Sequence, residues 1–152
     1  MLVGATDKKY LREGIEDYQK RVIHYLPFEI KVIADIKNSR NLTADQQKER
    51  EGQAILHLVS TGDELVLLDV DGAEYSSPEL AGWIEKRMLA GTRHLIFVVG
   101  GPYGFSAAVY KRADGKMSLS RLTFPHQLVR LLFVEQLYRA LTIIKGEPYH
   151  HA

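Results

Sequence analysis

The chain has 152 residues, of which 45% are hydrophobic and 26% are charged, and its net charge is +1. This length fits one domain with a sizeable core, and the absence of cysteine excludes disulfides, thiolate metal sites and a cysteine nucleophile. No apolar run reaches the roughly 20 residues of a membrane span, and the start lacks the apolar core of a signal peptide. We therefore expect a soluble, cytoplasmic protein with no membrane association.

The charges are distributed unevenly along the chain. Residues 1–110 carry 13 basic and 16 acidic side chains, whereas residues 111–152 carry 7 basic and 3 acidic ones, with three further histidines. A basic C-terminal third favours a polyanionic partner such as RNA, but clustering on a solvated surface produces the same pattern. The charge alone leaves both interpretations open.

The first 60 residues alternate strand-like and helix-like runs. The apolar start LVGA precedes a helix whose apolar positions are spaced four, three and four apart, namely Leu11, Ile15, Tyr18 and Val22. FEIKVI then alternates apolar and polar residues, as a half-buried strand does. Thr43 and Gln46 form a T-x-x-Q capping box for a helix that we expect to bury Ile55, Leu58 and Val59.

Two nearly continuous apolar runs, ELVLLD and LIFVV, follow in the middle of the chain. Such runs are typical of parallel strands buried on both faces. Between them, Ser77 and Pro78 suit the N-cap and first position of a helix that ends at Gly91, with Leu80, Trp83, Ile84 and Met88 as its apolar residues. This alternation predicts a single α/β domain, residues 1–152, around a parallel sheet.

The last third begins with the short strand-like KMSLS and the turn RLTFP, and continues as an unusually apolar helix. From residue 126 to 144, 12 of 19 residues are apolar, so this helix should be covered on more than one side. A second subunit is one cover, and burial within its own chain is the other. Glu135 and Arg139 are four residues apart and can pair.

The loop after LIFVV contains Gly100, Gly101 and Gly104. Parallel sheets bind ligands beyond the carboxyl ends of their strands, and glycines there allow a ligand to approach the backbone closely. The spacing G-G-x-x-G matches neither a Walker loop nor a dinucleotide motif, and Pro102 removes an N–H that an anion would need. A structural turn and a bed for a ligand without phosphates remain the two interpretations.

Two segments, HLIFVVGGPYGFS and SLSRLTFPHQLVRLLFVEQLYRALTIIKGEPYHH, resemble the bacterial large-subunit ribosomal RNA pseudouridine methyltransferases of the SPOUT class. The resemblance implies a C-terminal trefoil knot within the α/β fold, a homodimer, and S-adenosylmethionine bound at the knot. It also implies methylation of ring nitrogen 3 of a pseudouridine in 23S ribosomal RNA, which we expect to occur on the assembled ribosome. The cofactor residues carried over by motif are Leu68, Gly100, Leu119, Ser120, Arg121, Leu122, Thr123 and Phe124.

The same resemblance places the C-terminal tail near the reaction centre. The matching motif is G-E-x-Y-H, with Tyr149 and His150 as the candidate catalytic residues. His150 or water would remove the proton from the acceptor nitrogen, because the ordinary pKa of histidine lies near neutrality; contact with the RNA backbone alone is the other interpretation. Relatives often carry Arg or Lys where this chain has His151, which removes one permanent charge. Only three residues precede Gly4, so the first strand is shorter than usual or the start has been lost.

Three other functions are alternatives. A knotted methyltransferase acting on transfer RNA shares the same charge bias. A noncatalytic RNA- or nucleotide-binding α/β module would need no cofactor pocket. A metal site at Glu147, His150 and His151 is disfavoured, because adjacent histidines do not easily share one ion and no helix sets their spacing.

Overall fold

A computed structural model describes residues 1–151 and shows a five-stranded parallel sheet with the strand order β2-β1-β4-β3-β5. The strands are β1 Leu2–Val3, β2 Val32–Ile33, β3 Glu64–Glu74, β4 Leu95–Val99 and β5 Gly115–Ser118. The helices are α1 Lys9–Val22, α2 Ala44–His57, α3 Ser77–Leu89, α4 Ala107–Arg112 and α5 His126–Lys145, with a 3-10 turn at Ser39–Asn41. The α/β class with a parallel sheet is confirmed; of the expected domain, residue 152 lies outside the described residues.

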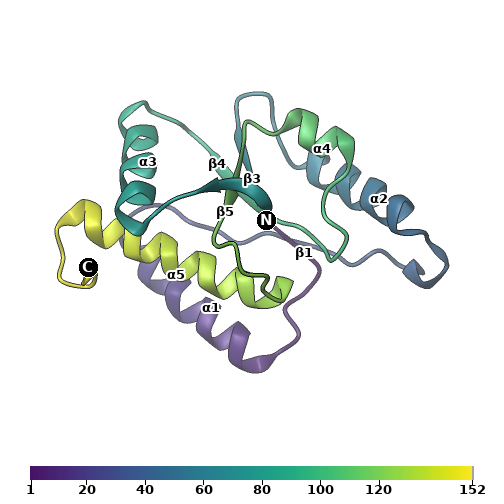
Figure 1. The fold of residues 1–152 in the computed structure, drawn as a ribbon, viewed down its shortest axis with the longest axis horizontal. Helices are drawn as coiled ribbons and strands as arrows, with labels where there is room; N and C mark the ends of the chain where they lie inside the picture. The colour runs from purple at the N-terminus through teal and green to yellow at the C-terminus, as the bar shows by residue number, and fades with distance from the viewer. Residues whose placement is uncertain (152) are drawn as a thin grey trace.

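The sheet lies between two layers of helices (Figure 1). Strand β3 needs helices on both faces of the sheet, because its side chains alternate between the two faces. Leu65 and Leu67 are buried in one cluster with Ile55 of α2 and Val109 of α4, whereas Val66 belongs to the opposite cluster beneath α3 and α5. The expectation that ELVLLD is buried on both faces is confirmed.

Two helices start with complete capping boxes. Thr43 Oγ1 accepts from the Gln46 N–H at 3.1 Å, and the Gln46 side chain accepts from the Thr43 N–H at 3.0 Å. At α3 the N-cap is Ser76 and not Ser77 as we predicted, because Glu79 stands three residues after Ser76 and closes the box with it. The expected end at Gly91 is confirmed, since this glycine follows the C-cap with φ +74°.

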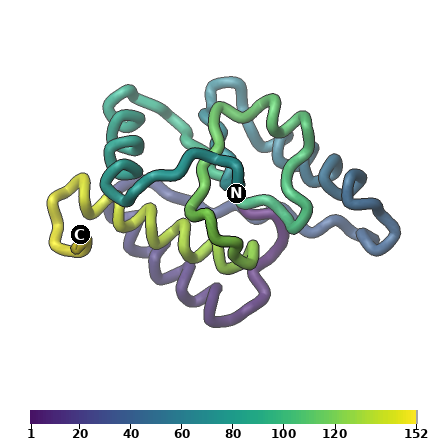
Figure 2. The backbone as a smooth tube through the Cα atoms, viewed as in Figure 1, coloured from purple at the N-terminus to yellow at the C-terminus, as the bar shows by residue number. Residues whose placement is uncertain are grey.

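Helix α5 is covered mainly by its own chain, as Figures 1 and 2 show, with α1 on one side and α3 near its C-terminal half. Gly14 of α1 allows the close contact, because a Cβ there would lie 2.9 Å from the Leu131 Cδ1. None of the residues from Gln127 to Ile144 is fully exposed. The apolar character of α5 is therefore explained in large part without a second subunit, and a dimer needs separate support.

Three other expectations need correction. Leu58 is 41% exposed and Met88 is 45% exposed, because α2 ends at His57 and Met88 lies in the last turn of α3. In FEIKVI only Val32–Ile33 forms a strand. Its neighbour β1 offers just two residues for pairing, so Phe28–Lys31 has no strand beside it.

The chain crosses its own backbone very closely at the end of β3. Both Leu68 and Ala73 pair with Met117 of β5, so residues 69–72 pass over that position. At Gly72 a Cβ would lie 2.4 to 2.6 Å from the backbone atoms of Met117, which only glycine can accommodate. This crossing is consistent with the expected trefoil knot.

We predict that Gly72→Ala destabilises the protein by about 1 to 3 kcal/mol, because its methyl group has no space beside a backbone that cannot move independently. Urea denaturation measures the change. Gly82→Ala in α3 is the control, since nothing lies within 4 Å of the position that its methyl group would take, and it should stabilise by about 0.5 to 1 kcal/mol. Equal stability of the two variants would contradict this interpretation of the crossing.

Candidate functional site

A hollow of about 100 Å³ lies where β3 leaves its pairing with β4 at Leu68, beyond the carboxyl end of β5 and beside the start of α5. This is the position at which open parallel sheets bind ligands. Six of the eight expected cofactor residues line it, namely Leu68, Leu119, Ser120, Leu122, Thr123 and Phe124. Residues far apart in the sequence thus meet at one place.

The segment 119–124 has a defined shape because serines bind its backbone. The Ser118 hydroxyl donates to the Ser120 carbonyl at 3.0 Å, and the Leu122 N–H donates to the Ser120 hydroxyl at 3.0 Å. The turn projects Leu122 outward with 70% of its surface exposed. Val70 on the opposite rim is 75% exposed, so two apolar side chains flank the opening.

The rim also contains residues that sequence reasoning did not identify. Asp69 and Val70 line the hollow from β3, and Val129 lines it from α5. The Tyr110 hydroxyl donates to Asp69 Oδ2 at 2.5 Å; burial, followed by this bond, raises the pKa of Tyr110 to about 12. Asp69 and Val70 could have been identified by their position in the sequence, because they directly follow Leu68 at the end of an apolar run.

The glycine loop lies beside the hollow but does not line it. Gly100 has the Phe105 ring beneath it, 3.0 Å from where a Cβ would lie, and Gly104 adopts φ +79°. On the α2 side, the buried Glu51 carboxylate faces Gly101, with Oε1 accepting from Gln47 and Oε2 lacking a partner within the described chain. Glu51 was also not identified from the sequence. The feature that could have indicated it is an acidic residue beside Gly52 on the apolar face of a helix.

Arg121 is the expected cofactor residue that points away. Its side chain is 90% exposed, and its Nε lies 3.4 Å from a carboxylate oxygen of Glu74. An exposed guanidinium of this kind suits contact with a phosphate better than contact with an apolar hollow.

The C-terminal tail folds back against α5 and α1. The Tyr149 hydroxyl donates to Glu135 Oε1 at 3.1 Å and lies 3.3 Å from the Tyr18 hydroxyl. Arg139 also donates to Glu135, at 2.6 Å, and its guanidinium stacks over the Tyr149 ring. Burial, together with these neighbours, raises the pKa of Tyr149 well above its usual range, so Tyr149 stays neutral and acts as a donor.

His150 is held by the same cluster. Its Nδ1 lies 3.5 Å from an Arg139 nitrogen, and its buried Nε2 has no partner among residues 1–151. Glu147 anchors the start of the tail by accepting a hydrogen bond from the Tyr25 hydroxyl. Because a guanidinium N–H can only donate, Nδ1 is the accepting nitrogen in this arrangement, and Nε2 carries the hydrogen of the neutral ring.

The structure does not bring the tail and the hollow together within one chain. The hollow touches the first turn of α5. The tail follows the last turn of this helix, at its opposite end (Figure 2). Twenty helical residues extend about 30 Å, and none of the tail residues to His151 lines the hollow. The two halves of the expected site are therefore separate in the monomer.

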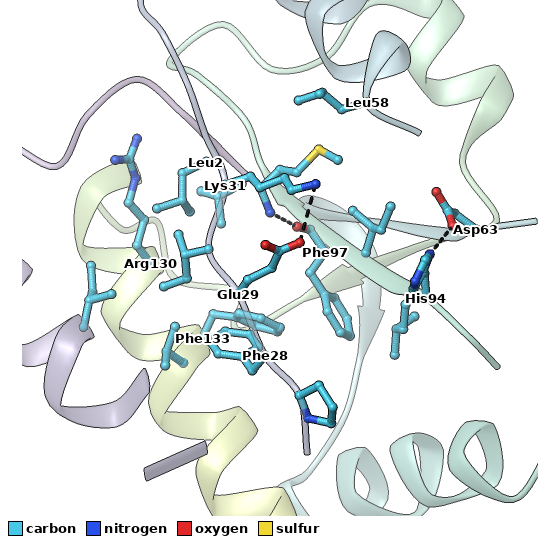
Figure 3. A pocket seen from close by; sticks show the side chains of 18 of the residues that line it. Leu2, Phe28, Glu29, Lys31, Leu58, Asp63, His94, Phe97, Arg130 and Phe133 are labelled. Carbon is cyan, nitrogen blue, oxygen red and sulfur yellow. Dashed lines mark hydrogen bonds and ion pairs between the residues drawn. The ribbon is translucent and has the colours of Figure 1, made fainter. Parts of the chain in front are cut away.

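A larger groove of about 790 Å³ lies at the other end of the sheet (Figure 3). It is bounded by the start of β4, the segment Pro27–Lys31 and the N-terminal residues. Parallel sheets bind ligands at their carboxyl ends, and this groove lies at the amino end of β4. Its size alone does not make it the cofactor site.

Two other classes of site have no counterpart in the described chain. Over residues 1–151, no three His, Asp or Glu side chains are placed so that they could share a metal ion. In the same range no helix combines the length and hydropathy that crossing a bilayer requires.

The chain is similar to known methyltransferases over nearly its full length. A family described as "Predicted SPOUT methyltransferase" matches residues 1–150. A protein of Parabacteroides distasonis named "Ribosomal RNA large subunit methyltransferase H" is 54% identical over 151 residues, which cover 99% of this chain and 96% of the relative. Proteins of the same name from Christiangramia forsetii and Porphyromonas gingivalis are 55% and 49% identical, covering 98% and 99% of this chain and 95% and 96% of theirs.

We predict that Glu135→Gln loosens the tail, because neutralising this carboxylate weakens its charged bonds to Arg139 and its bond from Tyr149. The free energy of unfolding should fall by about 1 to 3 kcal/mol. Trypsin should cleave after Lys145 several times faster, and the exposed Glu85→Gln is the control. Unchanged cleavage would show that Glu135 does not hold the tail.

Proposed function

The chain belongs to the SPOUT methyltransferase family, and we propose that it methylates ring nitrogen 3 of a pseudouridine in 23S ribosomal RNA with S-adenosylmethionine as donor. The observation that carries the proposal is the hollow, where six residues expected from the motif converge at the carboxyl end of a parallel sheet. The name of the relatives, ribosomal RNA large subunit methyltransferase, supports the substrate.

The residues at the hollow fit this cofactor. Its lining is mostly apolar, with Asp69, Ser118, Ser120 and Thr123 as the polar side chains, which suits a nucleoside with few charges. Leu68, Leu119 and Phe124 would contact the base, and the backbone at Gly100 would approach the cofactor closely. The bound donor would supply an electrophilic methyl group. The present volume is below the usual range for small-molecule sites, so the exposed turn at Leu122 must move or be completed by another chain.

The tail supplies the groups that the acceptor needs. Methyl transfer to nitrogen is a direct displacement, so alignment is the main contribution of the protein. Tyr149, kept neutral by its environment, would position the pseudouridine. His150 Nδ1, once the substrate displaces Arg139 from it, or a water molecule would accept the proton from the ring. Arg121, which is exposed beside the hollow, would contact an RNA phosphate.

A homodimer would unite the two halves of the site. Because the hollow and the tail lie at opposite ends of α5, an antiparallel partner places the tail of one copy at the hollow of the other. The apolar rim, Val70 and Leu122, is exposed in the single chain and would be covered by such a partner. We place this dimer on the assembled ribosome in the cytoplasm, since a domain of 17.3 kDa has little surface of its own for specific RNA recognition.

We predict that the protein transfers labelled methyl from S-adenosylmethionine to ribosomes from cells that lack it. Mass spectrometry should locate the label on one pseudouridine of the large-subunit RNA. Naked RNA should be a much poorer substrate, because the ribosome supplies recognition surface. Label on transfer RNA instead would show that the protein is a knotted methyltransferase that acts on transfer RNA. Failure to bind S-adenosylmethionine would favour a noncatalytic module.

We predict that two inactive variants restore activity when mixed. Thr123→Trp fills the hollow from an exposed position, and the double variant Tyr149→Ala/His150→Ala removes the tail groups. After subunit exchange, half of the dimers are mixed, and one of their two sites is intact, so activity should return to about a quarter of the normal value. Light scattering should give twice the monomer mass. If activity does not return on mixing, both halves of each site lie in one chain. Full activity of the Tyr149→Ala/His150→Ala variant alone would refute a catalytic role of the tail.

A further inference from the structure

The hollow and the glycine loop are connected by one carboxylate. Asp69 of β3 lines the hollow, and its Oδ2 accepts a hydrogen bond from the Tyr110 hydroxyl. That hydroxyl lies 4.0 Å from the position that a Cβ on Gly104 would take, so it adjoins the loop. A ligand that reaches from the hollow to the loop would therefore pass the Asp69 carboxylate.

This carboxylate is held in one orientation by the chain itself. Its Oδ1 accepts from the Asp71 backbone N–H at 2.9 Å, and its Oδ2 accepts from Tyr110 at 2.5 Å. The Tyr110 ring packs edge-on against the Phe105 ring, with centroids 5.8 Å apart, and its pKa of about 12 keeps the hydroxyl a donor. Asp69 is thus a preorganised acceptor.

The carboxylate has free capacity for further hydrogen bonds. An ionised carboxylate offers about four lone-pair sites and no donor, and one donor on each oxygen leaves about two of these sites open. No basic side chain within residues 1–151 forms an ion pair with Asp69. Asp69 is only partly buried, so water can occupy the open sites until a ligand with matching donors displaces it.

Neighbouring hydroxyl groups on a sugar match these open sites. Two vicinal hydroxyls can donate to the two oxygens of one carboxylate, whereas a sulfonium has no hydrogen to donate. In parallel sheets that bind dinucleotides, an acidic side chain accepts from a ribose hydroxyl in this way. The order along the chain agrees, because Asp69 directly follows Leu68, which would contact the base, and the sugar is bonded to the base.

We propose that Asp69 binds the ribose hydroxyls of the cofactor and thereby selects a ribonucleoside, with Tyr110 as the residue that positions the carboxylate. The inference rests on the proposed function, since it names the group that holds the sugar of the same cofactor. A ligand without these hydroxyls loses two hydrogen bonds to a charged acceptor and leaves that acceptor facing carbon. The site should therefore bind a ribonucleoside more tightly than its deoxy analogue.

The test is calorimetric titration with S-adenosylhomocysteine and with its 2′,3′-dideoxy analogue. The unaltered protein should bind the ribose form at least about tenfold more tightly. Asp69→Asn should lose most of this preference while its affinity for the dideoxy analogue changes by less than about twofold, and Tyr110→Phe should lose part of it. Asp71→Asn is the matched control, because its side chain is exposed and the variant keeps the backbone N–H that orients Asp69.

A second titration separates the sugar from the charge of the cofactor. Asp69→Asn should weaken binding of cationic S-adenosylmethionine and of neutral S-adenosylhomocysteine by the same factor, within about twofold. A clearly larger loss for S-adenosylmethionine would show that Asp69 pairs with a positive charge, and would overturn the proposal.

Two further results distinguish this inference from the proposed function. A preference for ribose that persists undiminished in Asp69→Asn would overturn the inference alone, because the unaltered protein would still bind the cofactor. Failure of the unaltered protein to bind either S-adenosylmethionine or S-adenosylhomocysteine would overturn the proposed function, and this inference with it.

Discussion

The passage of residues 69–72 over Met117 is the constraint on which the site depends. Gly72 allows two backbones to approach within a distance that any Cβ would prevent, and β3 consequently pairs with β5 twice, before and after the crossing. This arrangement places Asp69 and Val70 opposite the segment 119–124 and so forms the hollow between them. The candidate site is in this sense a product of backbone sterics before it is a product of side-chain chemistry.

Helix α5 connects the crossing to the rest of the molecule. Near its start the buried Arg130 donates to the carbonyls of Val3 and Gly4 and to the Thr6 hydroxyl, at 2.6 to 2.9 Å. Burial lowers the pKa of this guanidinium, and the carbonyl acceptors offset part of the cost of burying its charge. At the other end Glu135 and Arg139 hold the tail. One helix thus fixes β1, the hollow and the catalytic candidates relative to one another.

The two ends of the sheet differ in what lines them. At the carboxyl end, glycines, serines and short turns leave backbone groups and a few polar side chains around a small hollow, which is the composition of a ligand site. At the amino end of β4, the groove is lined by charged side chains such as Glu29, Lys31 and Arg93 as well as by apolar ones. The smaller of the two spaces is the candidate for chemistry, because it lies at the end of the sheet where parallel strands bind ligands.

The sequence by itself determined most of the elements and the family resemblance from which the chemistry is proposed. Periodicity located the buried strands, a capping box located the start of α2, and the Ser-Pro pair located that of α3 within one residue, because these signals are local. The motif brought Leu68 and the segment 119–124 to one site. Sequence could not show that Leu58 and Met88 are exposed, that Glu51 faces the glycine loop, or that FEIKVI is only half strand, because each depends on a neighbour distant in the chain. Only the tertiary structure decided that α1 and α3 cover α5, and that Tyr149 and His150 lie far from the hollow, since helix packing and the length of α5 set those distances.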